Sequence, residues 1–248
     1  MWVLLHGFTG SPESWHRVIE KAELRDDPLI PALTGHGPKW RDIEAHSFEG
    51  EVSRLADMVS ELERPRLIAG YSMGARLALG LLVTYPGLFD AAVLIGVHPG
   101  LADESAVTAR RALDQERARF LRSEGLDAFV QRWEREPLFR TQRSLPATLI
   151  ERQRILRLSH EAEGLAHALE VLGLAEMPNY GAAMDRIDVP VITMAGSHDS
   201  KFSQLARAMA REHAVVQERI IDGAGHNLLL EAPAAVAQAL ADAEGEAP

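Results

Sequence analysis

Short apolar runs alternate along the chain with longer stretches in which apolar residues recur at helical spacing. Runs of this kind, bounded by turn residues, are typical of strands that are buried on both faces of a parallel sheet. The pattern predicts helices over Gly74–Thr84, Phe202–Glu212 and Ala234–Ala243. It predicts strands over Trp2–Leu5, Arg66–Ala69, Ala91–Gly96, Val189–Ala195 and Glu218–Ile221, with a weaker strand at Leu29–Ile30.

The order of these elements predicts an α/β fold, a mostly parallel sheet flanked by helices on both faces. Residues 102–185 break the alternation, because they hold no strand-like run. They are predicted as several helices interrupted at Gly125, Pro137, Pro146, Gly164 and Pro178. We therefore expect a core made of residues 1–101 and 186–248, and an all-helical cap over the carboxyl ends of the strands, where such sheets bind ligands.

Composition narrows the possible partners. The formal net charge of −10 repels polyanions, which argues against nucleic acid and anionic membranes as partners. A small anionic substrate would need a local cluster of arginines. The absence of cysteine excludes disulfides and thiolate metal sites, and the N-terminal residues contain no signal-peptide pattern. We expect a cytoplasmic protein that acts as a monomer or a homodimer.

The first motif with chemical content is Gly70-Tyr71-Ser72-Met73-Gly74, which has the form G-x-S-x-G. It follows an apolar strand and opens a helix, which is the context that a nucleophile elbow requires. Small residues let the chain turn sharply, so that the Ser72 hydroxyl is exposed above the sheet. The alternative, an ordinary glycine-rich turn, does not account for this context.

A serine hydroxyl needs a neighbouring imidazole to take its proton, and in elbow enzymes the acid and the histidine follow the serine. His226 lies directly after the last predicted strand, and Asp199 lies just beyond the strand before it. We assign His226 as the base and Asp199 as the carboxylate that orients it. His198 is the nearest competitor for the histidine, whereas Asp222 is too close to His226 in sequence to orient it.

An oxyanion hole in this fold takes one backbone N–H from the loop after the first strand and one from the residue after the nucleophile. The corresponding residues are Phe8, in the segment His6-Gly7-Phe8, and Met73. His6 is expected to brace this loop without taking part in the chemistry.

Several motifs together make the chain resemble the 2-succinyl-6-hydroxy-2,4-cyclohexadiene-1-carboxylate synthases (the MenH family), which are α/β-hydrolase-fold enzymes of menaquinone biosynthesis. The first and third of these motifs are common among α/β-hydrolases, whereas the pieces around His98, Pro137 and Lys201 are more diagnostic. The motifs are Leu5 to Gly10 with Trp15, Gly35-His36-Gly37, Gly70 to Arg76, His98 to Leu101, Trp133 through Phe139, Asp199 to Phe202, and Ala224 to Asn227.

The resemblance implies a lyase without metal or cofactor, in which the serine acts as a base and pyruvate is eliminated. It also implies that arginines bind the carboxylates of the substrate, because guanidinium groups pair with carboxylates in a bidentate manner. Arg111 and Arg154 are alternatives to two of these arginines in register. The positions that match substrate-binding residues of the family are Arg76, Arg110, Arg157, Tyr71 and Trp133.

The chain departs from the family pattern in two places. The family has two further strands before the His-Gly-Phe loop, so the N-terminal edge strands are expected to be missing here. Ala75 also stands where glycine is common. Neither difference touches the predicted catalytic residues.

Two other functions stay open at this point. A carboxylesterase or C–C bond hydrolase would use Ser72 as a covalent nucleophile, although a neutral ester gives no reason for several arginines to converge. A non-catalytic ligand-binding protein of the same fold would have no use for an intact triad.

Overall fold

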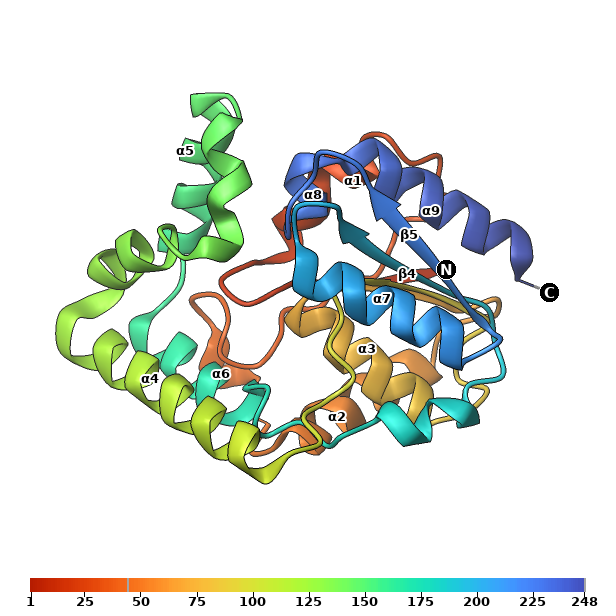
Figure 1. Ribbon diagram of the computed structural model, residues 1–248, viewed down its shortest axis with the longest axis horizontal. Coiled ribbons are helices and arrows are strands. Elements are labelled where there is room, and N and C mark those ends of the chain that lie inside the picture. Colours follow the sequence, from red (N-terminus) through yellow and green to blue (C-terminus); the bar gives the residue numbers. More distant parts are fainter. Residues whose placement is uncertain (44, 248) are drawn as a thin grey trace.

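The computed structural model describes residues 1–43 and 45–247 and shows a parallel sheet between two layers of helices (Figure 1). Five parallel strands lie in the spatial order β1-β2-β3-β4-β5. They are β1 (Trp2–Leu5), β2 (Leu67–Tyr71), β3 (Ala91–Ile95), β4 (Val191–Gly196) and β5 (Val216–Ile221).

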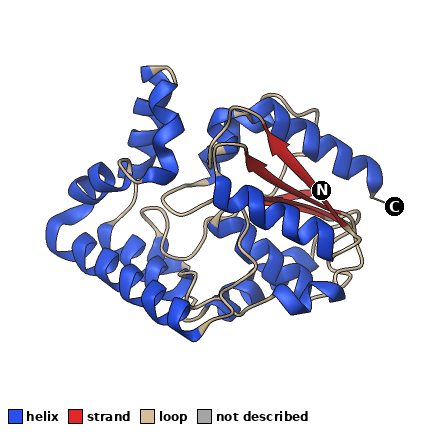
Figure 2. Ribbon diagram, viewed as in Figure 1, coloured by secondary structure: helices blue, strands red, loops and turns tan. Residues whose placement is uncertain are grey.

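The helices connect these strands and extend well beyond the sheet on one side (Figure 2). None of the helices within residues 1–43 and 45–247 is both long and apolar enough to cross a membrane. The helices are η1 (Pro12–Trp15), α1 (His16–Ile19), η2 (Trp40–Asp42), α2 (Phe48–Ser60), α3 (Met73–Thr84), α4 (Glu104–Trp133), η3 (Pro137–Ser144), α5 (Ala147–Leu158), α6 (Ala162–Leu172), η4 (Gly181–Arg186), α7 (Ser200–Glu212), α8 (Leu228–Glu231) and α9 (Pro233–Glu246).

All five predicted main strands are present, with boundaries that differ by a few residues. The weaker strand predicted at Leu29–Ile30 is wrong as a strand, because Leu29 forms only an isolated parallel bridge to Val3. Strand β2 continues through Gly70 to Tyr71, beyond its predicted end at Ala69. This extension brings the strand directly to Ser72.

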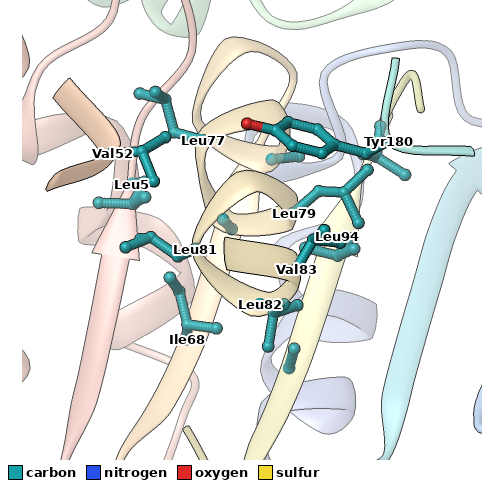
Figure 3. Packing of buried hydrophobic residues seen from close by; sticks show 14 of the residues in the cluster. Leu5, Val52, Ile68, Leu77, Leu79, Leu81, Leu82, Val83, Leu94 and Tyr180 are labelled. Atoms are coloured by element: carbon teal, nitrogen blue, oxygen red, sulfur yellow. The ribbon is translucent and has the colours of Figure 1, made fainter. Parts of the chain in front are cut away.

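Side chains that alternate along each strand separate into two cores. Val3 and Leu5 point to the face covered by α2, α3 and α7, whereas Trp2 and Leu4 point to the face covered by α1 and α9. Figure 3 shows the first core, in which strand residues such as Leu94 pack against the leucines of α3. Burial on both faces explains why the strands are continuous apolar runs.

The helices α4, η3, α5 and α6, here called the inserted helices, lie between β3 and β4 in the chain. Helices α4 and α6 pack against each other, and α5 stands away from the sheet (Figure 1). The boundaries of the predicted cap, 102 and 185, stay a prediction. Gly125 does bend α4, with φ 81° and ψ 173°, whereas the break predicted at Gly164 is wrong because this residue lies inside α6. A Cβ at Gly164 would lie 2.7 Å from the Gly35 carbonyl oxygen, so glycine here serves close packing.

Candidate active site

Ser72 lies in a strained turn between the end of β2 and the start of α3. Its φ of 53° and ψ of −105° fall in a region that residues with a side chain rarely adopt. The turn is tight because α3 starts against the first strand: a Cβ at Gly74 would lie 2.3 Å from the Leu5 carbonyl oxygen. The Ser72 N–H donates to the Ile95 carbonyl oxygen at 2.8 Å. This is the geometry expected of a nucleophile elbow.

The structure brings Ser72, His226 and Asp199 together. The His226 Nε2 atom is 3.0 Å from Ser72 Oγ, and its Nδ1 atom is 2.6 Å from Asp199 Oδ2. Histidine and aspartate are both buried, at 3% and 8% exposure, which keeps their hydrogen bond out of water. The competing His198 is exposed, and among the described residues its side chain hydrogen-bonds to neither Ser72 nor an aspartate; its backbone N–H donates to the Ala224 carbonyl oxygen.

The two backbone groups predicted for an oxyanion hole lie at the same place. Phe8 and Met73 both line the cavity that holds Ser72. In the described part of the chain, the N–H groups of Phe8 and Met73 donate to no other group. Both donors are therefore free to bind a negatively charged oxygen.

The cavity above Ser72 has a volume of about 280 Å³ and lies between the carboxyl edge of the sheet and the inserted helices. Its aromatic wall comes from both regions, since Phe8 packs edge-on against Trp133 with ring centroids 5.4 Å apart. Trp133 stacks on Phe129 from its other side. The predicted site residues that line this cavity are Phe8, Tyr71, Ser72, Met73, Arg76, Arg110, Trp133 and His226.

The buried guanidinium of Arg76 pairs with no carboxylate among residues 1–43 and 45–247. Arg76 is 8% exposed and stands one helical turn beyond Ser72, and its Nη1 atom has no acceptor within the described residues. Burial, with a smaller contribution from Arg110, lowers the pKa of Arg76 to about 9. A bound anion would relieve this unfavourable burial.

Arg110 lines the cavity together with Arg117, and the same carboxylate holds both. Asp114 accepts from Arg110 Nε at 2.7 Å and lies 3.5 Å from Arg117 Nη1. Arg117 also pairs with Glu136 and lies 5.0 Å from the Trp133 ring centroid. Arg117 was not predicted, although its position two helical turns after Arg110 places it on the same face of α4.

Arg157 lies outside this cavity. It is 3% exposed, pairs with Glu134 at 3.1 Å, and lines a neighbouring cavity of about 360 Å³ between α5 and the loop after β1. The two cavities share Phe8, Tyr71 and Phe139. The predicted contact of Arg157 with substrate therefore stays a prediction.

The two register alternatives are tied to acidic residues of the protein. Arg154 pairs with Glu134 and Asp127, and the exposed Arg111 pairs with Glu176. Neither lines the cavity above Ser72.

His98 and Lys201 also line the cavity and were not predicted as site residues. Burial and the cations around it, Lys201 first, lower the pKa of His98 to about 4, so its ring is neutral at pH 7. Its Nδ1 atom accepts from the Gly100 N–H at 3.2 Å, which leaves the proton on Nε2. Both residues follow the carboxyl ends of strands, and this position in the sequence could have identified them as site residues.

His6 braces the loop after β1, as predicted, and belongs to a row of three imidazoles. Its Nδ1 atom is 2.9 Å from the Gly7 carbonyl oxygen, and its ring contacts His36, which in turn contacts His160 ahead of α6. Burial lowers the pKa of His6 to about 4. These neutral rings connect the loop that carries Phe8 to the inserted helices.

Comparisons with known proteins identify the family and the fold of the chain. The model of the alpha/beta hydrolase family matches residues 2–239. The putative 2-succinyl-6-hydroxy-2,4-cyclohexadiene-1-carboxylate synthase of Bacillus subtilis (strain 168) is 35% identical over 235 residues, which cover 93% of this chain and 85% of that protein. The synthase of the same name from Enterobacter sp. (strain 638) is 34% identical, over 96% of this chain and 89% of its own length.

Two solved structures extend the comparison. MenH from S. aureus superposes with a TM-score of 0.93 at 29% identity, covering 99% of this chain and 93% of its own. A thermophilic esterase from Thermogutta terrifontis superposes with a TM-score of 0.78 at 27% identity, covering 97% and 88%.

Proposed function

We propose that this chain is a lyase that forms 2-succinyl-6-hydroxy-2,4-cyclohexadiene-1-carboxylate. The chain belongs to the alpha/beta hydrolase family and, within it, to the synthases named for that product. Its substrate would be 2-succinyl-5-enolpyruvyl-6-hydroxy-3-cyclohexene-1-carboxylate, which loses pyruvate. The observation that carries the proposal is Arg76, whose buried guanidinium lies beside Ser72 and has no carboxylate partner in the part of the chain that the structure describes. This substrate brings three carboxylates to such a site.

Ser72 would act as the base of the elimination. His226 Nε2 takes the serine proton, and Asp199 holds the other ring nitrogen and stabilises the imidazolium. The serine oxygen removes the proton from the ring carbon that carries the succinyl group. The C–H electron pair becomes a ring double bond, the existing double bond moves by one position, and the C–O bond to the enolpyruvyl group breaks. The released enolate takes up a proton and becomes pyruvate.

The backbone donors would stabilise the charge that develops during proton removal. Negative charge spreads from the ring carbon to the succinyl carbonyl oxygen, and the N–H groups of Phe8 and Met73 are free to bind that oxygen. Trp133 and Phe8, which pack edge-on against each other, would help to keep water from the reacting atoms. Arg76 and Arg110 would hold carboxylates, and Tyr71 and Trp133 would contact the ring.

A carboxylesterase is the second candidate, because the same triad could attack an ester carbonyl and the esterase fold is closely similar. The cations that line the cavity weigh against it, since a neutral ester offers them no partner. The cytoplasmic location, and a monomer or homodimer as the working form, stay predictions.

The experiment that separates the two candidates offers the purified protein both substrates. The lyase predicts rapid pyruvate release from the enolpyruvyl intermediate and negligible turnover of p-nitrophenyl acetate. Fast ester turnover without pyruvate release would overturn the proposal.

A further inference from the structure

The loop that carries His226 is held on both sides of the histidine by a single carboxylate. The Gly225 N–H donates to Glu231 Oε2 at 2.8 Å, and the Asn227 N–H donates to Glu231 Oε1 at 3.2 Å. Glu231 is the last residue of the short helix α8, and its side chain turns back toward the loop that precedes this helix. Both carboxylate oxygens are used, and the residue between the two donors is His226.

Other hydrogen bonds also reach this loop, from the His198 N–H to the Ala224 carbonyl oxygen and from the Leu228 N–H to the His226 carbonyl oxygen. The N–H groups on either side of the histidine, however, both donate to Glu231. The loop runs from the end of β5 at Ile221 to the start of α8 at Leu228, so His226 lies in no strand or helix. The position of its ring depends on the hydrogen bond to Asp199 and on the backbone at Gly225 and Asn227, both of which are buried. Hydrogen bonds from N–H groups to an ionised carboxylate are stronger than those to a neutral acceptor. Glu231 is therefore well suited to fix this backbone.

Thr141, from the inserted helix η3, packs against the other side of the loop that carries His226. A Cβ added at Gly225 would lie 2.0 Å from Thr141 Oγ1 and 3.1 Å from Glu231 Oε2. The Gly225 backbone is thus confined between the inserted helices and Glu231, with no space for a side chain.

We propose that Glu231 is a positioning residue that holds the His226 ring at hydrogen-bonding distance from Ser72. This role rests on the proposed function of the same site, but it concerns activation of the serine and not the identity of the substrate. Loss of the carboxylate would let the loop shift, and a displacement of about 1 Å at a reacting group lowers the rate of chemistry by about 100-fold.

The test compares Glu231→Ala and Glu231→Gln with Arg17→Ala. Alanine removes both acceptors, whereas glutamine keeps one carbonyl oxygen for one N–H. Arg17→Ala is the matched control, because Arg17 Nη1 donates to the Leu230 carbonyl oxygen at 2.6 Å and so supports the same helix, while its side chain makes no hydrogen bond to residues 222–227 in the described part of the chain. All three variants are compared with the native protein in thermal unfolding.

Two rates are measured. The first is pyruvate release, for which we expect kcat to fall about 10- to 100-fold in Glu231→Ala, with KM changed less than about twofold and Glu231→Gln intermediate. The second is labelling of Ser72 by a fluorophosphonate, in which a P–O bond forms, fluoride leaves and His226 takes the proton. This rate should fall in the same order, and Arg17→Ala should change neither rate.

A native kcat in Glu231→Ala would overturn the inference. An equal loss of kcat in Arg17→Ala would also overturn it, since Glu231 would then only stabilise α8. If the native protein releases no pyruvate but labelling still slows in Glu231→Ala, the proposed function fails and the positioning role stands.

Discussion

The carboxyl edge of the sheet and the inserted helices contribute to one cavity, but they hold their side chains in different ways. Ser72, Asp199 and His226 follow the ends of β2, β4 and β5, which bring them to one edge of the sheet, and backbone hydrogen bonds of the connecting loops complete their placement. Arg110 and Arg117 extend from a helix and are held by carboxylates of the protein. The first arrangement is fixed by the backbone, whereas the second depends on ion pairs that a ligand can exchange.

The strongest test of the sheet edge is Ser72→Ala. No other group in the elbow can remove the proton from the substrate carbon that carries the succinyl group. We therefore expect pyruvate release to fall at least about 1000-fold. The measurement is single-turnover pyruvate release. Ser60→Ala, at the exposed end of α2, should retain the native rate. Residual activity above about 10% in Ser72→Ala would exclude this serine as the base.

The next largest effect compares a buried arginine with an exposed one. Arg76→Met should lower kcat/KM about 100-fold, since a buried charge pair with the substrate is lost, whereas Arg111→Met should change it less than about twofold. The same substitution should increase the stability of the fold. Burial disfavours the charge on Arg76, so Arg76→Met should raise the free energy of unfolding by about 1 to 3 kcal/mol. Denaturant titration checks this, and a loss of stability in Arg76→Met would contradict it.

The row of three imidazoles, His6, His36 and His160, joins the loop after β1 to the inserted helices and should make the fold sensitive to mild acid. Burial lowers the pKa of His6 to about 4, from an ordinary value near 6.5. Between these values the unfolded chain binds a proton that the folded chain does not, so stability present at pH 7 is lost as the pH falls. His6 alone should lower the free energy of unfolding by about 2 kcal/mol between pH 7 and pH 5, about 30-fold in the unfolding equilibrium.

Chemical unfolding at the two pH values measures this loss. The His6→Gln variant should lose less stability than the native protein over the same interval. Equal stability of the native protein at pH 7 and pH 5 would show that the buried imidazoles are not the acid-sensitive contact between the two regions.

The smallest expected effect tests the contact of the inserted helices with the histidine loop. Gly225→Ala would place a methyl group against Thr141, and we expect the resulting shift to lower kcat about tenfold. Thr141→Gly removes the closest colliding atoms and leaves only the 3.1 Å approach to Glu231 Oε2, so the double variant should recover part of the activity. Steady-state kinetics of the three variants provides the measurement. If the double variant is no better than Gly225→Ala, the loop is displaced by another contact.

The same contrast explains which parts the sequence could predict. Ser72, Asp199 and His226 follow apolar runs, and parallel strands bring their carboxyl ends to one edge whatever the details of packing. Leu29 could not be placed in this way, because a single bridge at the side of a sheet leaves no repeating pattern.

The arginines were harder to place because a helix with charges on several faces does not show which face is covered. The bend of α4 at Gly125 further separates the faces on either side of it, and no periodicity reveals the bend angle. Arg110 was predicted by resemblance and lines the cavity, whereas Arg157 lines the neighbouring one. Arg117 could have been found from its spacing to Arg110.

Asp114 competes with any anionic ligand for two of the arginines that line the cavity above Ser72. It occupies both Arg110 and Arg117 at a local concentration that no free monocarboxylate in solution can match. A ligand with one negative charge would gain little by displacing it, whereas a ligand with three carboxylates can engage several cations at once. Selection by charge would then keep common small anions away from Arg110 and Arg117.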